Sequence, residues 1–380
     1  MRNINNILPI ELFFQIFHHL VFADGPLGLR KALFVCRLWN SIIFNDSHLW
    51  TNIVFNQTFV QQLVPYPGKL LNYIERCGAS SGDHFIRIEV DTRAIHDHIY
   101  PGGVRAQQSD QQRVSSTGFS LFTIARAMVQ ARSFSEKIRT LVLSGGHRPS
   151  AAIRITIFMI INLVEDRLQH LELRMYTDDA IESIVRIFNS VETVFLLEPN
   201  WEGPGYVSSK QIAARRLVFQ RTSPWRGEDL THLGLYQKLR ELRLIWCPTG
   251  VAEPSSFKVE PFYHMNVAHT RHSVLLPSVT TLYMRGVIPF RILDPLSLPA
   301  LTMMEVQNHE FRQPLSTVRS TTLHYPITKL VVRFTPETAE GWGGALAAVL
   351  AAASQLHTLI APRWMERHLS VPENVKLELV

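Results

Sequence analysis

An amphipathic pattern with a broad apolar stripe fills the first part of the chain. Large apolar residues recur at intervals of three and four, and the stripe consists of Leu8, Leu12, Phe13, Ile16, Phe17, Leu20 and Val21. This pattern predicts a helix that begins at Pro9, because proline suits the first helical turn, and that ends at Asp24-Gly25-Pro26. Shorter helices are predicted at 29–36 and 38–44, before the apolar pair Leu49-Trp50.

These helices carry more large apolar side chains than they can bury among themselves. A unit of roughly forty residues has too little interior for them, since small domains bury a small share of their surface. The remaining apolar surface needs a partner, which is either another domain of the chain or another protein.

The order of residues in this region resembles an F-box. The resemblance is carried by Leu8-Pro9, Glu11-Leu12, Ile16-Phe17, Leu20, Val35-Cys36, Trp39, Ile42 and Leu49-Trp50. It implies a three-helix module over residues 1–55 that docks on a Skp-type adaptor and thereby joins a cullin-based ubiquitin ligase. The adaptor contacts that the resemblance implies are Leu8, Pro9, Leu12, Ile16, Leu20, Val35 and Trp39. The alternative from the pattern alone is a helical cap on a larger domain.

A helical linker is predicted at 56–84. Pro65 and Pro67 mark a turn, and the apolar residues from Leu70 to Cys77 predict a helix that stops at Gly78. A strand at 85–90 follows. This succession resembles the region after the F-box in many fungal F-box proteins, so a fungal type of F-box protein is expected.

From residue 85 onward a short motif recurs, in which an apolar residue is followed by further apolar residues three and five positions later. Copies start at Phe85, Ile138, Leu168, Val191, Ala214, Leu239, Val279, Leu301, Ile327 and Leu356, and Leu377-Leu379 is a trailing copy. Starts at 168, 191, 214 and 239, and at 279, 301 and 327, lie 22 to 26 residues apart. Leucine-rich repeats recur every 20–29 residues or so, as a strand plus a helix or a looser return.

The predicted fold is therefore α/β, with an N-terminal three-helix F-box followed by an irregular leucine-rich-repeat solenoid, or horseshoe, over 85–380. Insertions are expected at 91–118, which is polar and lacks a period, and at 248–277. The Asn or Cys that such repeats place after the third apolar residue occurs only as Cys247. A doubly covered α/β domain therefore stays open as the alternative.

Composition adds bounds on the partners and the compartment. Apolar residues make up 46% and charged residues 18% of the chain, as in a soluble globular protein. The net charge of +6 raises the question of nucleic acid, but no basic helix or stripe concentrates it. Three scattered cysteines indicate a reducing compartment, and no stretch suits a signal peptide or a membrane span. We expect a cytoplasmic or nuclear protein with no nucleic-acid or membrane partner.

No motif assigns a catalytic residue, a metal or a cofactor. The run from Gly78 to Gly82 matches the G-x-S-x-G of a nucleophile elbow, but here a predicted helix precedes it and a strand follows, which reverses the elbow. His264, His269 and His272 form a cluster without nearby cysteines, which favours a polar loop over a zinc site. A non-catalytic adaptor is therefore expected.

The repeats also predict where a protein partner would bind. Side chains alternate along a strand, so the residues between and after the apolar positions face away from the core. In a horseshoe these positions line the concave surface, where solenoids usually bind. The substrate contacts predicted there are Arg174, Arg243, Tyr283, Arg285 and Arg333. Solvated strand residues without a partner are the alternative.

The resemblance implies the substrate-recognition subunit of a Skp–cullin–F-box ubiquitin ligase. The F-box would bind the adaptor and, through it, the cullin, while the repeat domain would capture a protein substrate for ubiquitination. The alternative is a protein-interaction scaffold that uses the F-box outside any ligase.

Overall fold

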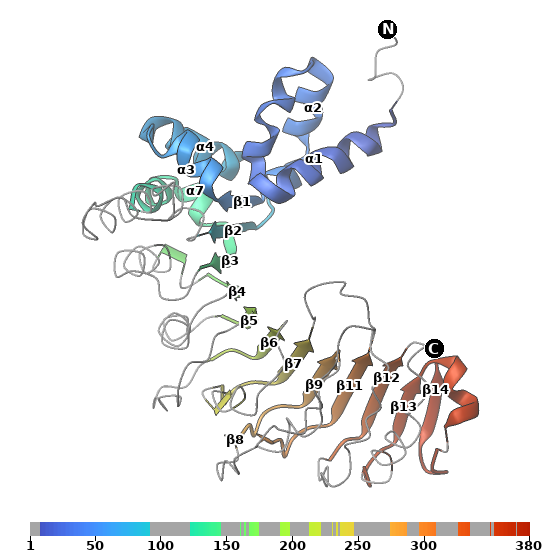
Figure 1. Cartoon of the computed structure of the whole chain (residues 1–380). Helices are drawn as coiled ribbons and strands as arrows, with labels where there is room; N and C mark the ends of the chain where they lie inside the picture. The colour runs from blue at the N-terminus through green and yellow to red at the C-terminus, as the bar shows by residue number, and fades with distance from the viewer. Residues whose placement is uncertain are drawn as a thin grey trace, which may run out of the picture. The chain divides into compact units, whose positions relative to one another are not determined.

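A computed structural model gives the fold of the protein, drawn in Figure 1. It describes residues 8–91, 122–145, 160, 163–164, 167–174, 191–197, 213–221, 230, 233–234, 236–246, 274–286, 296–308, 326–334, 350, 353–369 and 371–380. The chain divides into two compact units, Met1–Val191 and Glu192–Val380. Each unit contains its own run of parallel strands.

The N-terminal helices of the first unit follow the predicted order. α1 spans Ile10–Asp24 and α2 spans Arg37–Asn45, which confirms the first and third predicted helices. Where one short helix was predicted at 29–36, the chain forms two 3₁₀ helices, η2 (Gly25–Arg30) and η3 (Ala32–Phe34). The segment is short and begins with proline and glycine, so 3₁₀ turns connect the two longer helices instead.

Gly25 ends α1 at a position where a side chain would be strained. Its φ of 62° lies in the left-handed region, and a Cβ there would lie 3.0 Å from both the Asn52 carbonyl oxygen and the Val54 nitrogen. These two residues belong to β1 (Asn52–Phe55), which follows η4 (Ser47–Trp50). The glycine therefore lets the end of α1 approach the first strand closely.

An aromatic cluster joins α1 to α2. Phe13 and Phe17 are fully buried, and the Trp39 ring of α2 lies against both, with ring centroids 5.6 and 5.3 Å away. Trp50 is buried as well, and its indole N–H donates to the Ile43 carbonyl oxygen over 3.0 Å. Aromatic rings bury about 150–250 Å² each, so this cluster supplies much of the apolar burial that fixes the helices.

The rest of the first unit alternates helices with parallel strands. Its helices are α3 (Gln57–Leu63), α4 (Pro67–Ser80), a helix at 122–130 and α7 (Arg132–Ser135). Its strands pair in parallel and in chain order, as β1, β2 (Ile86–Asp91), β3 (Ile138–Ser144) and β4 (His170–Arg174). The strand β1 therefore continues the N-terminal helical region directly into the sheet.

The helix α3 was not predicted, although the sequence holds a cue for it. The Asn56 side chain accepts a hydrogen bond from the Phe59 N–H over 3.0 Å and so caps the helix, a role in which asparagine is common. The predicted linker at 56–84 thus folds as two helices, α3 and α4. The limits of the predicted domains, 1–55, 56–84 and 85–380, stay a prediction.

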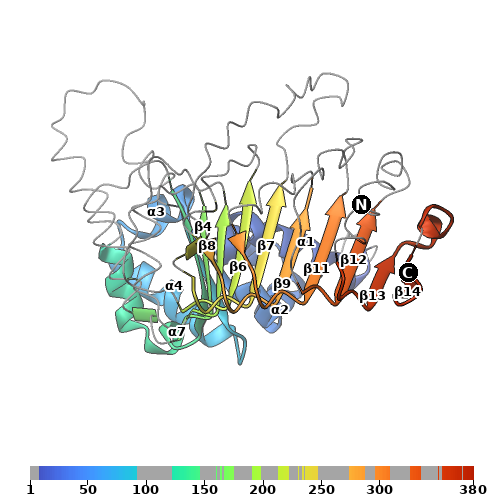
Figure 2. The ribbon, with the colours of Figure 1, turned by 90° about the horizontal axis from the view of Figure 1, so that it is seen from below.

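Parallel strands also form the main sheet of the second unit. In sheet order the described strands are β5 (Thr193–Leu197), β6 (Arg216–Arg221), β7 (Glu241–Trp246), β9 (Thr281–Arg285), β11 (Met303–Asn308), β12 (Lys329–Phe334), β13 (Thr358–Ala361) and β14 (Lys376–Leu379). Figure 2 shows the strands from β6 to β13 side by side and running the same way. The short strands β8 (Val274–Leu275) and β10 (Leu296–Ser297) pair separately, and the 3₁₀ helix η9 (Arg363–His368) precedes β14.

Each copy of the predicted apolar motif coincides with a strand. In the second unit the motif's apolar residues lie opposite one another and are buried, as Leu242, Leu282, Met304 and Leu330 illustrate on four neighbouring strands. Ladders of this kind bury each strand against the next. In the second unit the motif therefore marks strands that share one apolar layer.

A repeated hydrogen-bond pattern leads into the strands of the second unit. The Arg240 carbonyl oxygen accepts from two consecutive N–H groups, those of Thr280 and Thr281. The Thr280 carbonyl oxygen in turn accepts from Thr302 and Met303. Successive strands are thus entered through the same local geometry, which fixes their spacing and their register.

The mixed helix-and-strand fold with a parallel sheet is confirmed, whereas the leucine-rich-repeat solenoid and its horseshoe shape stay predictions. The expected insertions at 91–118 and 248–277 lie mostly outside the described residues. The described ends of the insertions are folded. Asp91 ends β2, and β8 lies within the second expected insertion, where the Leu276 N–H donates to the Ser297 carbonyl oxygen over 2.9 Å.

Candidate functional site

Three apolar side chains form a row on one exposed side of α1, which is called the α1 stripe from here on. Leu12, Ile16 and Leu20 are 39, 40 and 38% exposed and follow one another every four residues. Phe13 and Phe17, one position further along, are buried in the aromatic cluster. One side of the helix therefore forms the core, while these three large apolar side chains, and Ile10 and Phe22 near the two ends of the helix, are exposed. Exposed apolar side chains grouped in this way are typical of a protein-binding surface.

More exposed apolar side chains occur where η3 leads into α2. Phe34, Val35 and Leu38 are 83, 56 and 41% exposed. Val35 belongs to the predicted adaptor contacts, whereas Phe34 and Leu38 were missed. The signal that could have found them is their place in a segment of three short helices, which is too small to bury every large apolar residue that it holds.

The remaining predicted adaptor residues differ in their exposure. Pro9 is exposed and Leu8 is half-buried, both just before α1. Trp39 is half-buried because it packs on Phe13 and Phe17, so its ring contacts lie inside the helical bundle. The predicted set thus lies on or beside α1 and at the start of α2, and its contact with an adaptor stays a prediction.

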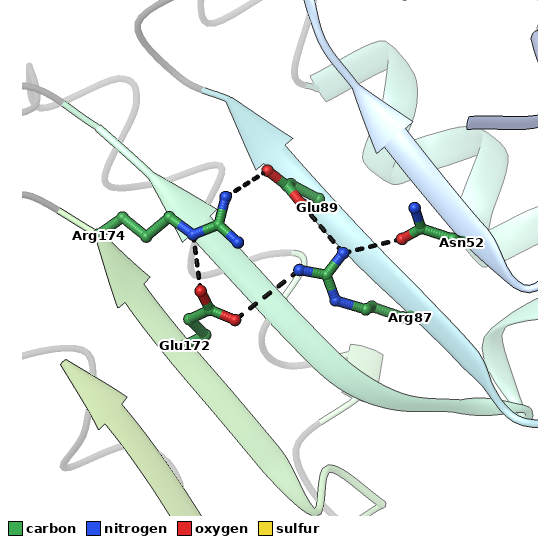
Figure 3. A network of polar contacts seen from close by, with 5 residues as sticks. All are labelled: Asn52, Arg87, Glu89, Glu172 and Arg174. Carbon is green, nitrogen blue, oxygen red and sulfur yellow. Dashed lines mark hydrogen bonds and ion pairs between the residues drawn. The ribbon is translucent and has the colours of Figure 1, made fainter. Parts of the chain in front are cut away.

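A closed network of ion pairs joins the strands of the first unit, as Figure 3 shows. Arg87 on β2 donates to Glu89 over 3.0 Å and to Asn52 on β1 over 2.9 Å, and it lies 3.7 Å from Glu172 on β4. Arg174 on β4 donates to Glu172 over 2.7 Å and to Glu89 over 2.8 Å. Two guanidiniums therefore meet two carboxylates, and the network is neutral.

The network crosses over β3. Val142 of β3 lies in register between Glu89 and Glu172 and is fully buried, although it shares their polar side of the sheet. Ion pairs that span from β2 to β4 above Val142 account for this burial. Burial by itself would lower the pKa of Arg174, but its hydrogen bonds and charge interactions with the two glutamates raise the pKa. Arg174, predicted as a substrate contact, is thus engaged by carboxylates of its own unit.

The polar side of the second unit's sheet brings together the four other predicted substrate residues. Arg243 on β7 lies opposite Tyr283 on β9, with its guanidinium carbon 5.3 Å from the ring centroid, within the range of a cation–π contact. Two positions further along the strands, Arg285 on β9 and Arg333 on β12 both lie level with Gln307 on β11. These side chains share one side of the sheet.

Glu241 holds two arginines at one end of this surface. The Arg216 side chain donates to its carboxylate over 2.8 Å, and Arg243 donates to the other carboxylate oxygen. Burial would raise the pKa of Glu241, but the two guanidiniums outweigh it and lower the pKa below its usual range. One carboxylate shared by two cations leaves one positive charge unbalanced.

The centre of the surface combines an aromatic ring with an exposed cation. The Tyr283 hydroxyl donates to the Gln307 side-chain oxygen, and burial is the main cause that raises the tyrosine's pKa. Arg285 is exposed, and no carboxylate among the described residues pairs with it. Val331 of β12 lies between two motif positions, where the alternation along the strand predicts a side chain that faces away from the core, but it is buried. Leu330 and Val332 beside it are buried too, and the strand is apolar on both sides there.

Searches of the described residues for a metal site and for a membrane-spanning helix gave no candidate. No three His, Cys, Asp or Glu side chains among them gather where they could hold a metal ion, and no described helix is long and apolar enough to cross a membrane. The histidine cluster at 264–272 lies outside the described residues. Burial raises the pKa of the Cys77 thiol to about 12, which keeps it protonated. The Gly78–Gly82 run ends α4 and precedes β2, so the order of a nucleophile elbow is reversed, as predicted.

Comparison with known families identifies the N-terminal region. The F-box-like family model matches residues 6–56, the segment that holds the α1 stripe and the exposed residues of η3 and α2. The chain therefore contains an F-box-like domain, and F-box domains generally bind Skp-type adaptors. A search of the curated proteins found no match to the chain.

Proposed function

We propose that this protein is the substrate-recognition subunit of a Skp–cullin–F-box ubiquitin ligase. The observation that carries the proposal is an F-box-like domain whose Leu12, Ile16 and Leu20 side chains stand in solvent. Each of them would contribute on the order of 1 kcal/mol when an adaptor covers its exposed part. Phe34 and Val35 would add to this apolar contact.

In this role the chain performs recognition rather than chemistry. The adaptor would connect the chain to a cullin, and ubiquitin transfer would take place on other subunits of the ligase. Such a subunit works in the cytoplasm or the nucleus, where the ligase is assembled.

The parallel strands would form an irregular leucine-rich-repeat solenoid that captures the protein substrate. Two features of the second unit support this proposal: the buried apolar ladders and the repeated hydrogen bonds that lead into each strand. Units that stack only on their neighbours bury a continuous core in this way. The polar side of the sheet would then receive the substrate.

Affinity purification of the full-length chain from cells treated with a proteasome inhibitor tests the proposed function. Wild-type protein is expected to recover a Skp-type adaptor and a cullin. Ile16→Arg would bury an unpaired charge in the contact and should lose both while it keeps its substrate. Recovery of the adaptor without any cullin would contradict the ligase role and favour a scaffold.

A further inference from the structure

The polar side of the second unit's sheet carries positive charge that its own carboxylates do not balance. The described ionisable residues that share this side from β6 to β12 are Arg216, Glu241, Arg243, Arg285, Glu305, Lys329 and Arg333. Five of these are cations and two are carboxylates. The corresponding network of the first unit, with two arginines and two glutamates, is neutral by contrast.

Both carboxylates of this surface already accept hydrogen bonds from arginines, and both are less exposed than Arg243 and Arg333. Glu241 accepts from Arg216 and Arg243, and Glu305 accepts from Arg333 over 2.8 Å. The two glutamate side chains are 20 and 19% exposed, against 43 and 55% for Arg243 and Arg333. Since a guanidinium only donates hydrogen bonds, the outermost charged groups offer donors to whatever approaches.

We propose that this surface binds an extended acidic segment of a protein partner, rich in Glu or Asp. Arg243, Arg285 and Arg333 would pair with its carboxylates, and the Tyr283 ring would support the backbone between them. The proposal rests on the proposed function and names the class of substrate.

The spacing of the cations favours an acidic segment over a single phosphate. Adjacent strands lie ~4.8 Å apart and two positions along a strand span ~6.6 Å, so the Cα atoms of Arg243 and Arg285 lie ~8 Å apart and those of Arg285 and Arg333 ~10 Å. Carboxylates on alternate residues of an extended peptide recur every ~6.8 Å, which suits cations spread in this way.

Fluorescence anisotropy with the full-length chain tests the proposal. The probe is a short labelled peptide of alternating Glu and Ser, and the same peptide with Gln in place of Glu is the reference. Arg285→Gln should weaken binding of the Glu peptide by about tenfold, because it removes a charge-assisted contact. Arg240→Gln is the matched control, since Arg240 is exposed, lies just before β7 and carries the same charge; it should change binding by less than about twofold.

Support requires that the Glu peptide bind more tightly than the Gln peptide and that only Arg285→Gln weaken it. Equal effects of the two substitutions would overturn the proposal, because they would show a response to net charge alone. Tighter binding of a phosphoserine version, or of single-stranded RNA, would also overturn it. Arg285→Gln should bind the adaptor as tightly as wild type does. If the peptide experiment fails, the proposed class of substrate is therefore wrong, while the proposed ligase role is still tested separately by adaptor and cullin binding.

Discussion

The charge of Glu241 makes the stability of the second unit depend on pH. Burial opposes its ionised form, but Arg243 and Arg216 together lower its pKa in the folded protein. A carboxyl group whose pKa is lower in the folded state stabilises the protein above its unfolded pKa, about 4.3 for glutamate. That stabilisation is lost as the pH falls through the folded pKa, when the group takes up its proton.

Glu241→Gln should therefore lower the stability of the second unit at pH 7 and have a shrinking effect as the pH is lowered from about 5 to about 3. The measurement is the urea midpoint of wild type and variant across this range. Glu192→Gln is the control, because Glu192 is exposed just before β5 and forms no ion pair among the described residues. A difference for Glu241→Gln that stays constant with pH would contradict the account.

The helices α4 and α7 approach each other closely at Gly78. A Cβ built on Gly78 would lie 2.9 Å from the Phe134 nitrogen and 3.0 Å from its Cα and Cβ. Phe134 belongs to α7 and is fully buried, so it cannot move aside to make room for an added methyl group. Gly78 was predicted as a helix stop, whereas it lies inside the last turn of α4 and permits this contact.

Gly78→Ala should destabilise the first unit by about 1–3 kcal/mol through overpacking, although alanine favours a helix more than glycine does. Gly68→Ala on the same helix is the matched control, since no atom lies within 4 Å of the Cβ it would add. It should be neutral or stabilise by up to ~1 kcal/mol. Chemical denaturation of both variants measures the contrast, and equal free-energy changes would show that the helices do not meet closely at Gly78.

Across the whole molecule, the strands that carry the apolar motif were predictable because their signal is local. A buried apolar residue at every second position marks a strand wherever it occurs, and the copies starting at Leu239, Val279 and Leu301 each lead into one. The strands β8 and β10 carry only two residues each, which is too few for a period to show. The 3₁₀ helices between α1 and α2 depend on how neighbouring helices pack, so local propensity favoured an ordinary helix instead.

The sequence predicted where the candidate sites lie, but not which of their side chains form ion pairs with one another. The resemblance to an F-box selected α1, and alternation along strands selected the polar sides of the sheets. Which arginine meets which glutamate depends on register between strands far apart in sequence, as the pair of Glu89 and Arg174 illustrates. Only the register distinguishes Arg174, held by its own unit, from Arg285, which is exposed.

We propose that the F-box-like domain docks on a Skp-type adaptor through the α1 stripe. Calorimetric titration of the purified full-length chain with a purified adaptor tests it, using wild type, Ile16→Arg and Gln15→Arg. Gln15 is exposed on the same helix, about 100° around it from Ile16, so its substitution adds the same charge away from the centre of the stripe. The account predicts a loss of at least about 100-fold for Ile16→Arg and less than about threefold for Gln15→Arg, with unchanged circular dichroism. Binding of Ile16→Arg at wild-type strength would contradict it.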